Sequence, residues 1–112
     1  MTPSNNRLLT SAAQDALQSV GEHIKLARQR RKLSQSLLAD RAGVGVVTVR
    51  RLEKGESVGI DTLANILVAL NLEDTLLKVA SPSEDEVGIA MEKRQTPKRI
   101  RKRSSDDLDT NF

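Results

Sequence analysis

The feature that most restricts the fold of this chain is the spacing of small, turn-forming and apolar residues over 35–52. Ala39 is small where two helices can cross closely, and Gly43 can adopt the left-handed conformation that ends a helix. Apolar residues that can face a shared core follow at Val44, Val49 and Leu52. This spacing predicts two short helices, over 35–42 and 46–53, joined by a tight turn. A plain helical hairpin within a bundle is the alternative, and it needs only the apolar positions.

Helical patterns continue on both sides of this segment. Apolar residues recur at steps of three and four before it, at Leu17, Val20, Ile24 and Ala27. Gly21 interrupts that run, so the sequence predicts a break between a short leading helix and a helix over 21–32. Ser34 is a favourable N-cap for the helix that follows it, and Gly55 is expected to stop the helix that begins at 46.

Three further helices are predicted beyond residue 60. The clearest pattern places Leu63, Ile66, Leu67 and Leu70 on one helical face, with Asn71 as a left-handed terminator. A short helix over 73–79 is expected to turn Leu72, Leu76 and Val79 inward. The composition changes at SPSEDE, where Ser83 and Glu86 form an S-x-x-E capping box that predicts a helix over 84–94.

These elements predict an all-α fold with a single main domain. A short leading helix and five further helices are expected over residues 11–80, after a loose N-terminus at 1–10 and before a C-terminal helix and charged tail at 81–112. The one aromatic residue, Phe112, stands at the last position, so the core must be built from aliphatic and small side chains.

The charges of the chain are segregated, although the formal net charge is only +3. Nine basic residues and three acidic ones lie between Glu22 and Lys54, and five more basic residues lie between Lys98 and Arg103. Clustered Lys and Arg side chains bind nucleic acid by releasing counterions from its phosphates. A solvated helix face is the other interpretation of such a run, so charge by itself leaves both open.

Several short motifs together resemble a known family. They are R-x-x-x-x-L-S-Q from Arg28, LADRAGV from Leu38, V-x-x-L-E-K-G from Val49, and the helix D-T-L-x-x-I-L-x-A-L from Asp61. The segment that holds them is similar to the helix-turn-helix family of phage repressors (Xre/Cro type), across five helices and about half of the chain. The resemblance implies a DNA-binding transcriptional repressor that acts as a homodimer on a palindromic double-stranded operator.

The resemblance also implies roles for individual residues. Arg28 and Glu53 match a buried ion pair that ties the first helix of the domain to the third. The third helix matches the recognition helix that enters the major groove. Gln35 would hold a phosphate, and Arg50 and Lys54 would lie near the DNA backbone. The residues implied to lie toward the bases are Gly45, Val46, Val47 and Arg51, and Thr48 on the same helix is also implied to bind DNA.

This sequence departs from the family pattern at the start of the third helix. Gly45 stands where a capping Ser or Thr is usual, which predicts a weaker cap. Val46 and Val47 replace polar residues that often read bases, so their contacts would be limited to thymine methyl groups. Arg51 is therefore the best candidate for a bidentate contact with guanine, and DNA shape is expected to supply part of the preference.

The tail after Ser81 is similar to tails of HipB-type antitoxins, repressors that bind HipA-type serine/threonine kinase toxins. That resemblance implies an antitoxin that neutralises a kinase and regulates its own operon. Two alternatives stay open: a phage or metabolic repressor without a toxin partner, and a helical adaptor that does not bind DNA. A solvated tail that adds non-specific DNA affinity would explain the same residues.

Other function classes lack their residues in this sequence. Cysteine is absent and His23 is the only histidine, so we expect no enzyme site, no metal and no cofactor. The GVG at residues 43–45 lacks the Lys-Ser/Thr ending of a phosphate loop. The start MTPSNNRLLT lacks the features of a signal peptide, and no apolar run reaches the length of about 18 residues that a membrane span needs. The expected location is the cytoplasm, in association with the nucleoid.

Overall fold

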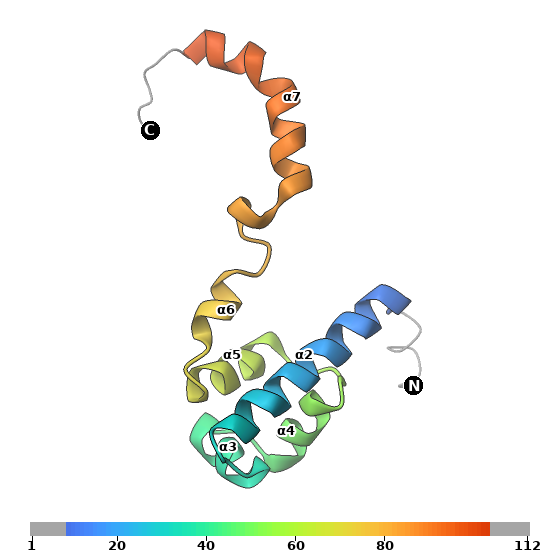
Figure 1. Cartoon of the computed structure of the whole chain (residues 1–112), viewed down its shortest axis with the longest axis vertical. Helices are drawn as coiled ribbons and strands as arrows, with labels where there is room; N and C mark the ends of the chain where they lie inside the picture. Colours follow the sequence, from blue (N-terminus) through green and yellow to red (C-terminus); the bar gives the residue numbers. More distant parts are fainter. Residues whose placement is uncertain (1–8, 104–112) are drawn as a thin grey trace. The chain divides into compact units, whose positions relative to one another are not determined.

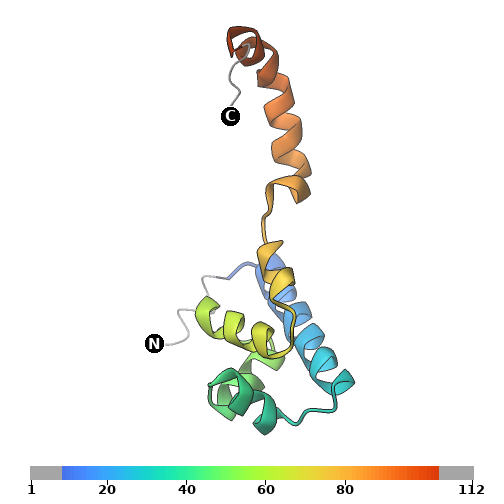
Figure 2. The same cartoon turned by 90° about the vertical axis from the view of Figure 1, so that its left-hand side faces the viewer.

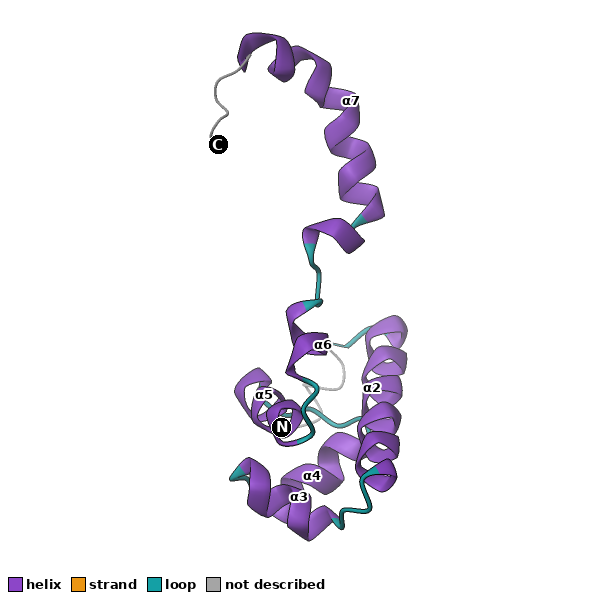
Figure 3. Cartoon of the chain, turned by 60° about the vertical axis from the view of Figure 1, so that its left-hand side comes forward, coloured by secondary structure: helices purple, strands orange, loops and turns teal. Residues whose placement is uncertain are grey.

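The computed structural model describes residues 9–103, with side chains as far as residue 95 (Figure 1). Within this range every regular element is a helix, so the all-α prediction is confirmed (Figure 3). The helices are α2 (Ser11–Arg30), α3 (Gln35–Ala42), α4 (Val46–Glu53), α5 (Ile60–Ala69), α6 (Glu73–Leu77), the 3-10 turn η1 (Pro82–Glu84) and α7 (Glu86–Arg103). Residues 1–8 of the predicted loose N-terminus (1–10) and the acidic end of the tail lie outside the described residues.

The chain divides into two compact units, one ending at Leu76 and the other beginning at Leu77. The first unit holds α2–α5 and most of α6, which Figures 1 and 2 show from two sides. The second unit holds η1 and α7. The predicted division into 11–80 and 81–112 stays a prediction.

Helix α2 is continuous, and the predicted break at Gly21 is wrong. Gly21 is buried inside the helix, against the C-terminal end of α4. A Cβ atom at this position would collide with the carbonyl oxygen of Leu52 and lie 2.8 Å from that of Glu53. The glycine therefore lets two helix backbones approach closely, a use that costs some helix propensity but does not break the helix.

Helices α2–α5 all end in the same way. At each end a residue with positive φ follows the helix, and the next N–H donates back to a carbonyl in the last turn, which is the Schellman arrangement. The left-handed residues are Lys32, Gly43, Gly55 and Asn71. The returning bonds are Leu33 N to Arg28 O, Val44 N to Ala39 O, Glu56 N to Arg51 O and Leu72 N to Leu67 O, with N···O distances of 2.8–3.2 Å.

Three of the four residues after these stops are apolar and help to build the core. Leu33 is buried, and Val44 and Leu72 pack against the buried cluster. The fourth residue is Glu56, which is exposed. Since an apolar residue after the stop normally fixes the direction in which the chain leaves, Glu56 is the exception in this domain.

The core lies among α2, α3, α4 and α5 and is aliphatic, as predicted from the lack of aromatic residues. Leu38, Val49, Ile66 and Leu70 are completely buried at its centre. Ala39 is also buried, where α3 packs closely on α4. The Ser34 hydroxyl accepts a hydrogen bond of 3.0 Å from Leu37 N, which confirms the predicted cap of α3.

Helix α6 is shorter than predicted. Leu72 and Leu76 pack against the core, but Val79 is exposed, so the expectation that Val79 faces inward is wrong. The α-helix ends at Leu77, and Val79 therefore does not continue the helical face on which Leu76 lies.

Helix α7 also departs from prediction at both ends. Asp85, not Ser83, caps it: the Asp85 carboxylate accepts a 3.0 Å hydrogen bond from Gly88 N, whereas residues 82–84 form a 3-10 turn. The helix continues to Arg103, beyond the expected end at Arg94. A carboxylate at the N-cap also interacts favourably with the helix dipole, an interaction that a neutral serine lacks.

Candidate nucleic-acid interface

Helix α4 buries one face and leaves the opposite face free. Val49, Leu52 and Glu53 are buried. The outward face carries Val47, Arg50, Arg51 and the adjoining Lys54, all exposed. Val46 and Thr48 lie between the two faces and are half-buried, Val46 against the core. Of the predicted base-facing residues, the structure therefore places Val47 and Arg51 fully outward and turns Val46 partly inward.

The N-terminus of α4 has no side-chain cap, because Gly45 stands at the N-cap position. Among the described residues, and apart from its neighbours in the chain, the nearest atom to where a Gly45 Cβ would be is the Thr48 hydroxyl oxygen, at 4.0 Å. The first turn of α4 is therefore open to an approaching molecule, and the free N–H groups of a helix N-terminus favour a negatively charged one.

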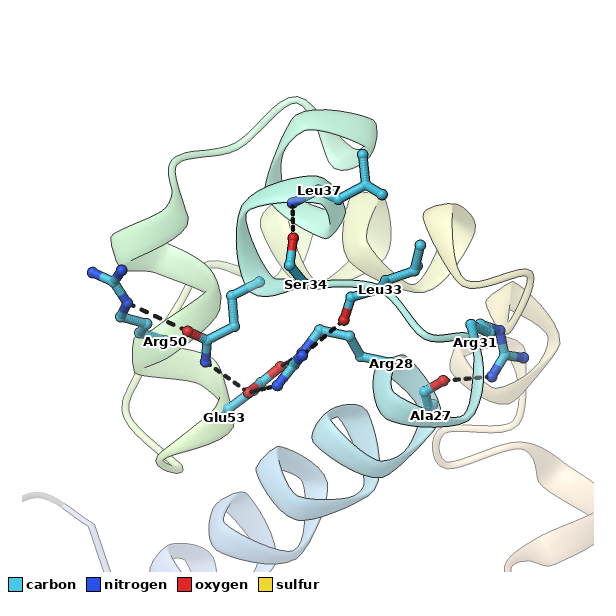
Figure 4. Close-up of polar contacts among 9 residues, drawn as sticks. Ala27, Arg28, Arg31, Leu33, Ser34, Leu37, Arg50 and Glu53 are labelled. Atoms are coloured by element: carbon cyan, nitrogen blue, oxygen red, sulfur yellow. Dashed lines mark hydrogen bonds and ion pairs between the residues drawn. The ribbon is translucent and has the colours of Figure 1, made fainter.

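A buried ion pair fixes α4 to α2. Arg28 Nε lies 2.7 Å from Glu53 Oε2, and Arg28 Nη2 lies 3.0 Å from Glu53 Oε1, so the contact is bidentate (Figure 4). The two side chains are only 10% and 4% exposed. Arg28 Nη1 also donates to the carbonyl oxygen of Leu33 at 2.8 Å, which ties the turn between α2 and α3 to the same group.

Gln35 connects this buried pair to the outward face of α4. Its Nε2 donates to Glu53 Oε1 at 2.9 Å, and its Oε1 accepts from Arg50 Nε at 3.4 Å. Gln35 is the first residue of α3 and is half-buried. The structure thus brings Arg28, Glu53, Gln35 and Arg50 into one network, whereas the sequence analysis separated them into an ion pair, a phosphate contact and a backbone contact.

Arg51 is held by the loop that follows α4. Its Nε lies 3.3 Å from Glu56 Oε1, and its Nη2 donates to the carbonyl oxygen of Ser57 at 2.9 Å. Sequence reasoning missed Glu56. Its only signal was an acidic residue directly after the Gly55 stop, a position where an apolar residue is usual.

The charge on the outward face of α4 is positive. Arg50, Arg51 and Lys54 supply three cations, while the carboxylate of Glu53 is buried and paired. Glu56 is the neighbouring acidic group that contacts this face, through Arg51. Such a surface attracts a polyanion and can donate several hydrogen bonds.

The part of the chain that the structure describes contains no group of three or more His, Cys, Asp or Glu side chains that could hold a metal ion. Over the same residues, no helix combines the length and apolar character needed to cross a membrane.

Comparison with known families gives a match to the helix-turn-helix family over residues 24–77. No curated protein matches the chain. The matched segment runs from the second half of α2 to the end of α6 and contains the α3–turn–α4 unit. It also contains the Arg28–Glu53 pair and all the outward residues of α4. Residues 24–77 are therefore similar to the all-α helix-turn-helix domains that DNA-binding transcriptional regulators carry.

Proposed function

We propose that this protein is a transcriptional repressor that reads the major groove of an operator with α4. The observation that carries the proposal is the outward face of α4, where three cations stand on a helix that is fixed to α2 by a buried bidentate ion pair. A rigid basic helix of this kind fits a major groove about 12 Å wide. A helical adaptor would not require the positive face.

The proposed contacts divide into two groups. Arg50, Lys54 and Gln35 contact phosphates and orient the domain, since Arg50 and Lys54 are exposed cations on the outward face and Gln35 bears an amide donor beside Arg50. Arg51 reads a guanine, and Val47 contacts a thymine methyl group. Gly45, Val46 and Thr48 line the first turn of α4, where close approach of the helix matters more than hydrogen bonding.

We further propose that the repressor is a homodimer on a palindromic site with half-sites about one helical turn apart. One short recognition helix contacts too few bases for strong selection. Large apolar side chains are exposed beyond the main core, at Leu77, Val79, Val87 and Met91. Burial of such side chains between two copies is a common basis of a dimer interface.

Alanine substitutions on α4 test the repressor function. Arg51→Ala is expected to weaken binding to the preferred duplex by about 1–3 kcal/mol and to relax preference at one base pair. Lys54→Ala is expected to weaken all duplexes alike and to reduce the salt dependence by about one ion. Equilibrium binding to a preferred and a random duplex, at several salt concentrations, measures both effects.

The outcome that contradicts the Arg51 assignment is an equal loss on the preferred and random duplexes. A protein that binds no DNA at low salt contradicts the repressor function altogether and favours the adaptor. A monomer that binds the preferred duplex with full affinity contradicts the dimer.

The finer proposal is that the repressor is an antitoxin for a HipA-type kinase and acts in the cytoplasm at the nucleoid. It rests on the resemblance of the tail after Ser81. Deletion of residues 96–112 is expected to abolish kinase binding and to leave operator binding intact, as measured by co-purification and by DNA titration.

Two other results of this deletion have different meanings. A lower salt dependence of DNA binding without any effect on a partner indicates that the basic segment is a DNA-binding arm. A fall of many degrees in the melting temperature shows that residues 96–112 belong to the fold, which contradicts both assignments.

A further inference from the structure

Glu56 occupies a position that the other helix ends of this domain use for packing. Leu33, Val44 and Leu72 stand at the equivalent positions after α2, α3 and α5, and each contributes to the core. Glu56 is exposed and contacts Arg51 on the outward face of α4. An acidic side chain at the edge of a phosphate-binding surface opposes affinity by like-charge repulsion. Its presence therefore calls for a role other than stabilising the turn.

The loop after α4 holds one edge of the Arg51 guanidinium. Glu56 accepts from Nε and the carbonyl oxygen of Ser57 accepts from Nη2, so the edge formed by these two nitrogens is occupied. A backbone hydrogen bond links the same two residues, because Glu56 N donates to the carbonyl oxygen of Arg51 at 2.9 Å. The loop itself is directed by the left-handed Gly55, with φ of 83°.

The contact leaves the other edge of the guanidinium free. A guanidinium has five N–H groups, and the loop uses one from Nε and one from Nη2. Both hydrogens of Nη1 and the second hydrogen of Nη2 are left. One hydrogen from each of these nitrogens forms a parallel fork at the tip of the side chain, which matches the O6 and N7 acceptors of guanine.

We propose that Glu56 is a specificity-determining residue of the interface, which positions Arg51 so that it reads guanine end-on. The inference rests on the proposed repressor function. Glu56 limits the rotamers of a long side chain, so less entropy is lost when Arg51 binds a base. It also offsets the charge of Arg51, which reduces attraction to any phosphate without removing the directional donors. Sequence selection thus depends on a residue outside the recognition helix.

Exposure separates this role from a structural one. The Arg51 and Glu56 side chains are 51% and 53% exposed. Pairs at this exposure contribute little to folding stability. Removal of the Glu56 carboxylate is therefore expected to change DNA selection while the melting temperature stays close to that of the unaltered protein.

The test compares full-length variants on duplexes chosen from a randomised DNA pool by the unaltered protein. The preferred duplex is titrated together with versions that carry each base substitution at each position. Arg51→Ala identifies the position that Arg51 reads. At that position Glu56→Ala is expected to reduce the preference for guanine by about 3- to 10-fold, part of the roughly 5- to 150-fold that a good bidentate contact supplies. Affinity for a random duplex is expected to stay equal or to rise.

Two further variants separate positioning from charge. Glu56→Gln keeps an acceptor for Arg51 Nε and is expected to restore part of the preference. Asp40→Ala removes another exposed carboxylate of the same domain, on α3, and is expected to leave the preference unchanged. In an Arg51→Ala background, Glu56→Ala is expected to have no further effect on selection.

The outcomes that overturn the inference differ from those that overturn the repressor function. Equal guanine preference in Glu56→Ala and the unaltered protein overturns the inference alone, and so does an equal loss in Asp40→Ala. A further loss of selection when Glu56→Ala is added to Arg51→Ala also overturns it, because Glu56 would then act without Arg51. If the unaltered protein selects no sequence from the pool, the repressor function fails first and the inference fails with it.

Discussion

Replacement of Glu53 by alanine is expected to lower the free energy of unfolding by about 3–5 kcal/mol, because it leaves a buried guanidinium without its counter-charge. The Arg28 side chain is 10% exposed, and it donates two short hydrogen bonds to the Glu53 carboxylate. The same substitution removes the acceptor of Gln35 Nε2. For a domain of this size the loss corresponds to a fall in melting temperature of at least about 10 °C. Thermal and urea unfolding of the full chain measure it.

The exposed pair of the same domain is a matched control. Glu56→Ala breaks the Arg51–Glu56 contact and is expected to cost less than about 1 kcal/mol, since both side chains are largely solvated. The double substitution Arg28→Met with Glu53→Leu removes both buried charges and is expected to recover much of the stability that Glu53→Ala loses. If the Glu53→Ala protein has the same melting temperature as the unaltered protein, the buried pair does not stabilise the fold as expected.

Replacement of Gly21 by alanine is expected to lower the free energy of unfolding by about 1–3 kcal/mol, although alanine is the better helix former. The new methyl group would collide with the carbonyl oxygen of Leu52 and lie 2.8 Å from that of Glu53. Both obstacles are backbone atoms, so neither can rotate away, and α2 must separate from α4. Since this displaces Glu53 from Arg28, DNA affinity is expected to fall together with the melting temperature.

Gly88 is the matched control for this substitution. It lies in α7, and the atoms nearest to its missing Cβ belong to the Asp85 side chain, which can rotate. Gly88→Ala disturbs the Asp85 cap but no helix backbone, so it is expected to cost about 1 kcal/mol or less, because the higher helix propensity of alanine offsets part of the weakened cap. A Gly21→Ala protein that is more stable than the unaltered one shows that helix propensity dominates and that the close approach is not required.

Local sequence determined where most of the helices end. Gly43, Gly55 and Asn71 stop their helices because a left-handed residue is needed there and glycine or asparagine adopts that conformation at little cost. Ser34 caps α3 through its own hydroxyl and a nearby N–H. These signals involve atoms within a few residues of each other, so no knowledge of the packing is required. Lys32 stops α2 in the same left-handed conformation without any such signal.

The tail shows where local signals compete. Ser83 and Asp85 are both good caps, and the capping box favoured Ser83, but the helix begins after Asp85. The end of the main core was also placed too far along the chain, because periodicity includes Val79 while the helix ends at Leu77. A pattern of apolar residues shows which face a continuing helix would bury, but not how far the helix continues.

The role of Gly21 and the arrangement of the outward face of α4 depend on how distant segments pack. In the sequence, a glycine in a helix can mark a break or a close crossing, and the choice depends on the backbone of Leu52 and Glu53, far along the chain. The family pattern predicted the Arg28–Glu53 pair, but the link through Gln35 to Arg50 depends on how α3 lies beside α4. The contact between Arg51 and Glu56 depends on the direction in which the chain leaves Gly55. Helix caps and stops involve only neighbouring residues and could therefore be predicted from the sequence. The partners of long side chains are set by the packing of distant segments and could not.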